Sequence, residues 1–362
     1  MCSVAHDLPP TVFTDHVDDE RWPENQRAVP SFCGALGQII MLRFITGRLV
    51  LTIPVLFGVS IIVFLLAHLA PGDVTTILAG PFATEVVKEK LRISFGLDQP
   101  LPVQYIKWLG HILQGDFGTS IANRRDVADL VFPKFVNTAI LALSSAVLAY
   151  IIGFFVGIFS AARPYSIADR VVMGVTLMLG NAPPYWLGLL IVLLLSLSWR
   201  LLPATGMTNI LGDGGAWDVF LHLIQPMLTT AAAPACIVAR IVRASMLEVL
   251  SQNYVQVARA KGIRRRTILH RHALRNALPP IVTVCGLQLG YLLGGVLFVE
   301  VIFAWPGIGN QLWQAIQARD IPTIQGATLV IALAFVVVNL AVDAINAYLD
   351  PKIRASEKAG AT

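Results

Sequence analysis

The chain has 362 residues, of which 56% are hydrophobic and only 14% are charged, with a mean hydropathy of +0.69 and a formal net charge of +5. This composition is too apolar for a water-facing globular domain and predicts a membrane protein. The four cysteines form no CxxC pair, so they indicate neither a disulfide framework nor a zinc site.

The first 40 residues differ from the rest. Acidic residues outnumber Arg21 and Arg27 there, prolines are scattered through the segment, and no apolar run is present, which excludes a signal peptide. We expect residues 1–40 to be a disordered cytoplasmic tail. Because Met41 directly precedes LRFITGRLV, where the membrane protein proper begins, an over-long start assignment is an alternative.

Six long runs without Asp, Glu, Lys or Arg follow, and roughly 20 apolar helical residues suffice to cross a bilayer core. The runs are continuous, whereas a transmembrane barrel shows short alternating segments. The sequence predicts an all-α membrane protein with six transmembrane helices, at Leu49–Ala70, Phe135–Ala162, Val171–Trp199, Val219–Ala239, Asn276–Val299 and Ile321–Val342.

These runs divide the chain into expected regions. We expect the first transmembrane helix within residues 41–70, an external loop region at 71–134, a transmembrane core at 135–350 and a cytoplasmic C-terminal tail at 351–362. Several predicted helices contain proline, which a packed membrane bundle tolerates as kinks. Gly153 and Gly157 form a GxxxG pair that permits close helix approach.

Lys and Arg concentrate in alternate loops, and cytoplasmic loops carry this excess. Arg163 and Arg170 lie between the second and third runs, and Arg240 and Arg243 follow the fourth. The opposite loops are poorer in basic residues or balance them with acidic ones. Both ends of the chain are therefore predicted to face the cytoplasm.

The segment between the fourth and fifth runs is unusually basic. From Tyr254 to Pro280 it reads YVQVARAKGIRRRTILHRHALRNALPP, with six Arg, one Lys, two His and no acidic residue. Gly262 separates two helix-compatible parts, residues 253–261 and 264–276; we call residues 253–276 the knuckle. Leu269, Ala273 and Ala277 are spaced i, i+4, i+8 and predict one buried face.

Three interpretations of this charge remain open. Ordinary positive-inside charge explains its sign but needs far fewer residues and no helical pattern. Clusters of four to eight Lys and Arg beside a membrane helix also indicate an anionic-lipid patch. The third interpretation is a docking element for a cytoplasmic partner.

YVQVARAKG followed by HALRNALPP resembles the coupling loop of the inner-membrane permease subunits of ATP-binding-cassette (ABC) importers for dipeptides and oligopeptides. The resemblance extends to MLRFITGRLVLTIPVLFGVSIIVFLLAHLAPGD, GLDQPLPVQYIKWLGHILQGDFGTSI, VEVIFAWPGIGNQL, ARDIPTIQGATL and NLAVDAINAYLDPKIR. It covers the chain from about Met41 to Arg354. It implies a type I ABC importer permease fold.

The resemblance assigns individual residues to the coupling loop, which spans residues 251–278. Ala258 and Gly262 occupy the alanine and glycine of the family's motif, and Pro279 is the proline that follows it. Gln256 replaces the acidic residue that names the motif, and the longer spacing from Gly262 onward is similar to that of peptide permeases. Ile263, which follows Gly262, is also assigned to the coupling loop. Gly262 permits a tight turn. Three arginines, Arg264, Arg265 and Arg266, present charge to an acidic partner surface.

The resemblance also implies partners and a location. The partners are a homologous second permease, two cytoplasmic ABC ATPase subunits that bind ATP and Mg²⁺, an extracytoplasmic substrate-binding protein and membrane lipid. No nucleic acid is expected as a partner. The location is a bacterial cytoplasmic (inner) membrane. This chain itself is expected to bind no cofactor or metal. Short peptides are the expected substrate; nickel or another small solute is the alternative in the same importer type. The break at Asn181, Pro183 and Pro184 is a candidate part of the substrate pathway.

Two other functional classes have less support. The chain has no GxxxxGK[ST], HExxH or GxSxG, so neither an ATPase of its own nor an intramembrane enzyme is indicated, and catalytic residues are not expected. A stand-alone secondary transporter needs ionisable residues deep in the membrane. Asp343, His68 and Glu300 lie near span ends, where we interpret them as structural; His270 and His272 diverge on a helix and do not form a metal pair.

Overall fold

The computed structural model describes residues 29–69, 84–94, 98–209 and 214–349. Two parts of the chain are distinguished, residues 1–44 and 45–362. Of the first part, only the helical residues 29–44 are described. The predicted tail over residues 1–28 and the predicted C-terminal tail lie outside the described residues.

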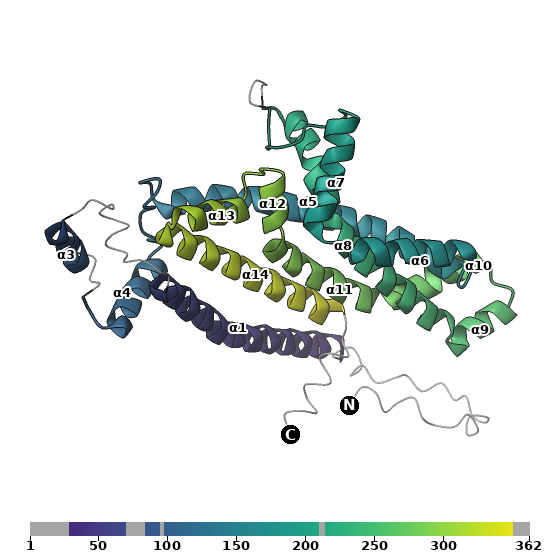
Figure 1. The fold of residues 1–362 in the computed structure, drawn as a ribbon. Helices are drawn as coiled ribbons and strands as arrows, with labels where there is room; N and C mark the ends of the chain where they lie inside the picture. The colour runs from purple at the N-terminus through teal and green to yellow at the C-terminus, as the bar shows by residue number, and fades with distance from the viewer. Residues whose placement is uncertain (1–28, 70–83, 95–97, 210–213, 350–362) are drawn as a thin grey trace. The chain divides into compact units, whose positions relative to one another are not determined.

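The described residues are helical, and their only β feature is an isolated bridge between Thr119 and Asp126. Figure 1 labels the helices. In chain order they are α1 (Val29–Leu69), α3 (Glu85–Ser94), α4 (Leu101–Leu113), α5 (Val127–Ala162), α6 (Ile167–Gly180), α7 (Pro184–Ile191) with its π-helical continuation η2 (Val192–Ser198), α8 (Ala216–Leu250), α9 (Asn253–Ala260), α10 (Arg265–Thr267), the π-helical η3 (Ile268–Ala273), α11 (Leu274–Gly295), α12 (Leu297–Ile302), α13 (Ile308–Ala318) and α14 (Ile321–Leu349).

Three helices of the described residues are each long and apolar enough to cross a membrane. They are Thr46–Leu66 within α1, Val127–Ala162, and Ile321–Ile345 within α14. The pair formed by α6 and α7–η2 makes a fourth if it is one span, although it is bent by 103°. The six-helix count therefore stays a prediction, while the helical architecture is confirmed.

Several predicted boundaries need correction. Residues 29–40, expected to be part of a disordered tail, are helical and form the start of α1, while the candidate span Thr46–Leu66 lies within residues 41–70. The region 71–134 is not only loop: it contains α3 and α4, and α5 already begins at Val127. The third predicted span is two helical pieces, because Pro183 and Pro184 interrupt backbone hydrogen bonding at that point.

The most extensive helix–helix packing among the described residues of the second part is between α5 and α8. Both glycines of the predicted GxxxG pair face α8: a Cβ at Gly153 would lie 2.7 Å from the Ala235 carbonyl oxygen, and one at Gly157 would lie 2.5 Å from the Val242 Cβ. The absence of side chains is what permits this approach. On the other side, α11 lies beside α8 and α14 (Figure 1).

Glu300 is structural, as predicted. Its carboxylate is fully buried, accepts a hydrogen bond of 2.5 Å from Thr138 on α5, and accepts another of 3.0 Å from the Asn310 backbone amide in the first turn of α13. A carboxylate is favoured at a helix N-terminus by the orphan amides there. A Cβ at Gly307 would lie 2.1 Å from a Glu300 oxygen, so the PGIG sequence gives the carboxylate its space.

Asp343 also has the structural partner expected of it. Its carboxylate lies 3.3 Å from the Arg48 guanidinium on α1. An ion pair of this kind neutralises an acidic residue near the end of a membrane helix. The side chain of His68 lies outside the described residues.

Candidate functional site

The knuckle follows directly from α8, which continues past its predicted end at Ala239 to Leu250. A short turn leads into α9, Gly262 joins α9 to α10, and helical structure then runs without interruption through η3 into α11. The prediction of two short helices meeting at Gly262 is confirmed. The second of them is continuous with the long helix α11.

Gly262 ends α9 in a Schellman motif. Its φ is +74°, a left-handed conformation that disfavours side chains. The Ile263 amide donates to the Ala258 carbonyl at 3.2 Å, and the Gly262 amide donates to the Arg259 carbonyl at 3.0 Å. These two bonds satisfy the carbonyls that the helix end leaves open. The stretch VARAKGI therefore terminates the helix by itself.

A small apolar cluster holds the knuckle together. Val255, Ala258 and Ile268 are buried, and Leu250 and Ile263 pack against them. Ala258, a predicted site residue, is thus buried inside the knuckle, while Ile263 is half-buried beside it. Because both short helices contribute, the angle between them is set by side-chain packing as well as by the turn.

The second half of the knuckle packs against the bundle. Leu269, Ala273 and Ala277 form the predicted buried face, with exposures of 9%, 0% and 1%, and they pack with residues of α5 and α8. Arg265 donates a hydrogen bond to the carbonyl of Ala162, the last residue of α5. The knuckle is therefore attached to α5 and α8 by packing and to α11 through the chain.

The outer surface of the knuckle carries the remaining predicted residues. Gln256, Arg264, Arg265 and Arg266 are exposed. Sequence reasoning missed two apolar neighbours on α9, Tyr254 and Val257, which are 44% and 54% exposed. Their i, i+3 spacing within a charged segment was the available signal. Exposed apolar side chains in an arginine-rich segment are suited to an acidic groove with an apolar floor.

Pro279 and Pro280 both lie inside α11, as the predicted span Asn276–Val299 required. Helical structure is therefore continuous from η3 into α11 and through both prolines.

The second predicted site is the break at residues 181–184. Asn181 ends α6, with its side-chain amide donating to the Leu177 carbonyl at 2.7 Å, and Pro184 begins α7. Asn181, Pro183 and Pro184 are exposed. The 103° bend between the two helices lies here, so the predicted break is present as a change of direction.

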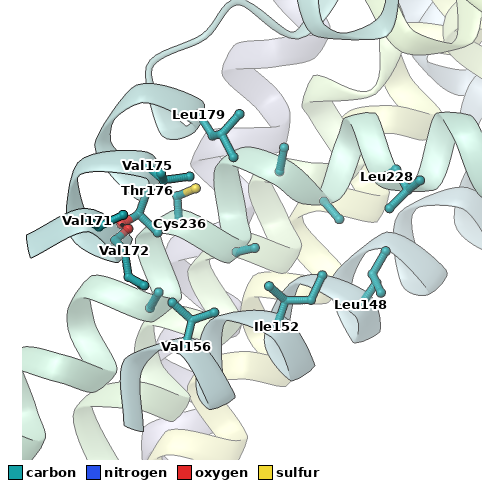
Figure 2. A pocket seen from close by; sticks show the side chains of 14 residues that line it. Leu148, Ile152, Val156, Val171, Val172, Val175, Thr176, Leu179, Leu228 and Cys236 are labelled. Carbon is teal, nitrogen blue, oxygen red and sulfur yellow. Dashed lines mark hydrogen bonds between the residues drawn. The ribbon is translucent and has the colours of Figure 1, made fainter. Parts of the chain in front are cut away.

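An apolar groove of about 430 Å³ lies beside this break (Figure 2). It is lined by α5 at Leu148 to Val156, by α6 at Val171 to Leu179, and by α8 at Leu228 and at small residues from Ala231 to Ala239. The Thr176 hydroxyl bonds to carbonyls of its own helix. Leu179 is the last residue of α6 that lines the groove, and Asn181, Pro183 and Pro184 do not line it.

In the part of the chain that the structure describes, no group of three or more His, Cys, Asp or Glu is placed to hold a metal ion. His270 is exposed, and the His272 side chain lies outside the described residues.

The chain is similar to known proteins over most of its length. Residues 153–355 match the model of the family described as binding-protein-dependent transport system inner membrane component, and residues 41–142 match that family's N-terminal membrane component. The chain is 40% identical over 314 residues to the glutathione transport system permease proteins GsiC of Escherichia coli strain K12 and of Salmonella typhi. These alignments cover 87% of this chain and 99% of each relative. A chain of the MetNI methionine ABC transporter in inward-facing conformations has a TM-score of 0.49 and 18% identity, over 59% of this chain and 93% of that one.

Proposed function

This chain belongs to the family of binding-protein-dependent transport system inner membrane components, the permease subunits of ABC importers, and we propose that it carries short peptides across the cytoplasmic membrane. The 40% identity to glutathione permeases over nearly their whole length supports this substrate class. Glutathione is itself a short peptide. Nickel or another small solute is the second candidate.

The proposed mechanism assigns ATP hydrolysis to separate subunits. Two cytoplasmic ATPases bind ATP and Mg²⁺, a second homologous permease completes the pathway, and an external binding protein delivers the peptide. The knuckle is the proposed docking element, with Tyr254, Val257, Arg264 and Arg266 facing the ATPase. Its role is mechanical: α10, η3 and α11 form one continuous helical path into the bundle.

The proposed substrate is tested by uptake. The full importer, produced with its own partner subunits, is placed in proteoliposomes with its binding protein and internal ATP. We expect ATP-dependent accumulation of labelled glutathione or dipeptides, competed by unlabelled peptide and not by Ni²⁺. Accumulation of ⁶³Ni²⁺ without peptide uptake would support the second candidate and contradict the first.

The proposed orientation places both termini and the knuckle in the cytoplasm, as the Lys and Arg distribution predicts. A reporter enzyme that is active only outside the membrane should work when fused after Gln114, at the end of α4, and should fail when fused after Ile263. A cytoplasm-active reporter at the same two positions is the control. An active external reporter at Ile263 would reverse the proposed topology.

A further inference from the structure

Asp169, in the first turn of α6, is a buried carboxylate surrounded by hydrogen-bond donors. Arg243 of α8 donates to it twice, through Nε at 2.8 Å and Nη2 at 2.7 Å. The Ser160 hydroxyl of α5 and the Tyr165 amide of the intervening turn also donate to it. The Asp169 side chain is 3% exposed. We call Ser160, Asp169 and Arg243 the Asp169 node.

The node joins three helices through one planar group. Two parallel bonds from a guanidinium to a carboxylate constrain distance and angle together. Buried ion pairs of this type contribute little net stability compared with apolar packing, but they strongly disfavour arrangements in which the partners separate. The node therefore specifies how the start of α6 and the last turns of α5 and α8 are placed.

The knuckle also contacts the last turn of α5, which carries Ser160 of the node. Arg265 donates to the Ala162 carbonyl, in the same final turn of α5 as Ser160. Ala161 in that turn packs with Leu269 and Ala273 of the knuckle. A displacement of the knuckle therefore acts on the last turn of α5, and through Ser160 on the node.

The far end of α6 is the bend at Asn181–Pro183. Near it, α6 approaches α8 closely: a Cβ at Gly180 would lie 3.0 Å from the Cβ of Cys236. Between the node and this contact, the apolar groove separates the α6 side chains from those of α5 (Figure 2). The helix is thus held at its two ends and has space along its middle, which suits a rigid element that moves as a unit.

We propose that the Asp169 node is a positioning element that transmits movement of the knuckle to α6, and so to the bend beside the groove. This inference rests on the proposed docking of an ATPase at the knuckle. In this proposal, one displacement of the knuckle moves both α11 and α6.

Asp169→Asn tests the proposal, because it keeps the size of the side chain and removes the charge that Arg243 pairs with. Arg243→Lys keeps the charge and loses the two-bond geometry. Arg240→Lys, on the same helix and exposed, is the control. For each complete importer in proteoliposomes we would measure bound ATPase, the rate of ATP hydrolysis and peptide uptake per ATP.

We expect Asp169→Asn to retain bound ATPase and ATP hydrolysis while uptake per ATP falls about tenfold, within the range of typical coupling effects. Uptake per ATP should fall less in Arg243→Lys. In Arg240→Lys it should equal that of the unmodified importer. Unchanged uptake per ATP in Asp169→Asn overturns the inference but leaves the proposed function intact. If both node variants fail to assemble, the node is a folding element and the inference is equally overturned. An unmodified importer that binds no ATPase contradicts the proposed function itself.

Discussion

Gly262→Asp is expected to abolish peptide uptake while the membrane bundle remains folded. At φ +74° any side chain strains the backbone, by about 1–2 kcal/mol for the left-handed conformation. A Cβ at this position meets nothing within 4 Å in the chain itself. Any larger effect must therefore come from a partner that occupies the space around the tip. ATPase co-purification and uptake are the measurements.

Gly115→Asp is a closely matched control. Gly115 ends α4 with φ +85°, and a Cβ there also meets nothing within 4 Å. Its amide donates to Ile112 and that of Asp116 to His111, both at 3.0 Å, which is the same Schellman pattern. Because α4 lies in the region predicted to be external, this variant should bear the same backbone strain and keep the ATPase bound.

The anionic-lipid interpretation of the knuckle predicts a different pattern. In that case Gly262→Asp has little effect, whereas successive Gln substitutions at Arg264 and Arg266 weaken activity in proportion to the charge removed, by roughly 1 kcal/mol each. Full uptake by the Gly262→Asp importer would exclude docking of an ATPase at this turn.

Gly157→Leu is expected to prevent α5 and α8 from packing. The first added carbon already lies 2.5 Å from the Val242 Cβ and 2.7 Å from the Ala239 carbonyl oxygen, and the backbone oxygen has no alternative position within a helix. Overpacking of this kind costs about 1–3 kcal/mol or more. We expect a lower midpoint of thermal unfolding and a much lower yield of monodisperse protein in detergent.

Gly174→Leu is the control for this substitution. Gly174 is also within a helix, α6, but a Cβ there meets nothing within 4 Å. Leu is a better helix former than Gly, so this variant should be neutral or slightly stabilising. Equal loss in both variants would show that the apolar leucine itself, and not close packing at Gly157, causes the effect.

Relations between neighbouring residues were accessible from the sequence. The glycine that ends α9, the buried face at Leu269, Ala273 and Ala277, and the pair Gly153 and Gly157 were all predicted, and the structure confirms each. Each depends on backbone conformation or helix periodicity, which act over a few residues. The structural roles of Glu300 and Asp343 followed from their positions near the ends of predicted spans.

The sequence by itself determined a helical membrane chain with a basic, glycine-broken knuckle, because apolar run length and local turn chemistry are written in consecutive residues. Only the tertiary structure decided that the third run bends by 103° and that Asp169 meets Arg243. The last two partners are 74 residues apart along the chain. Such contacts depend on which helices pack together, and that is selected by shape and burial over the whole bundle.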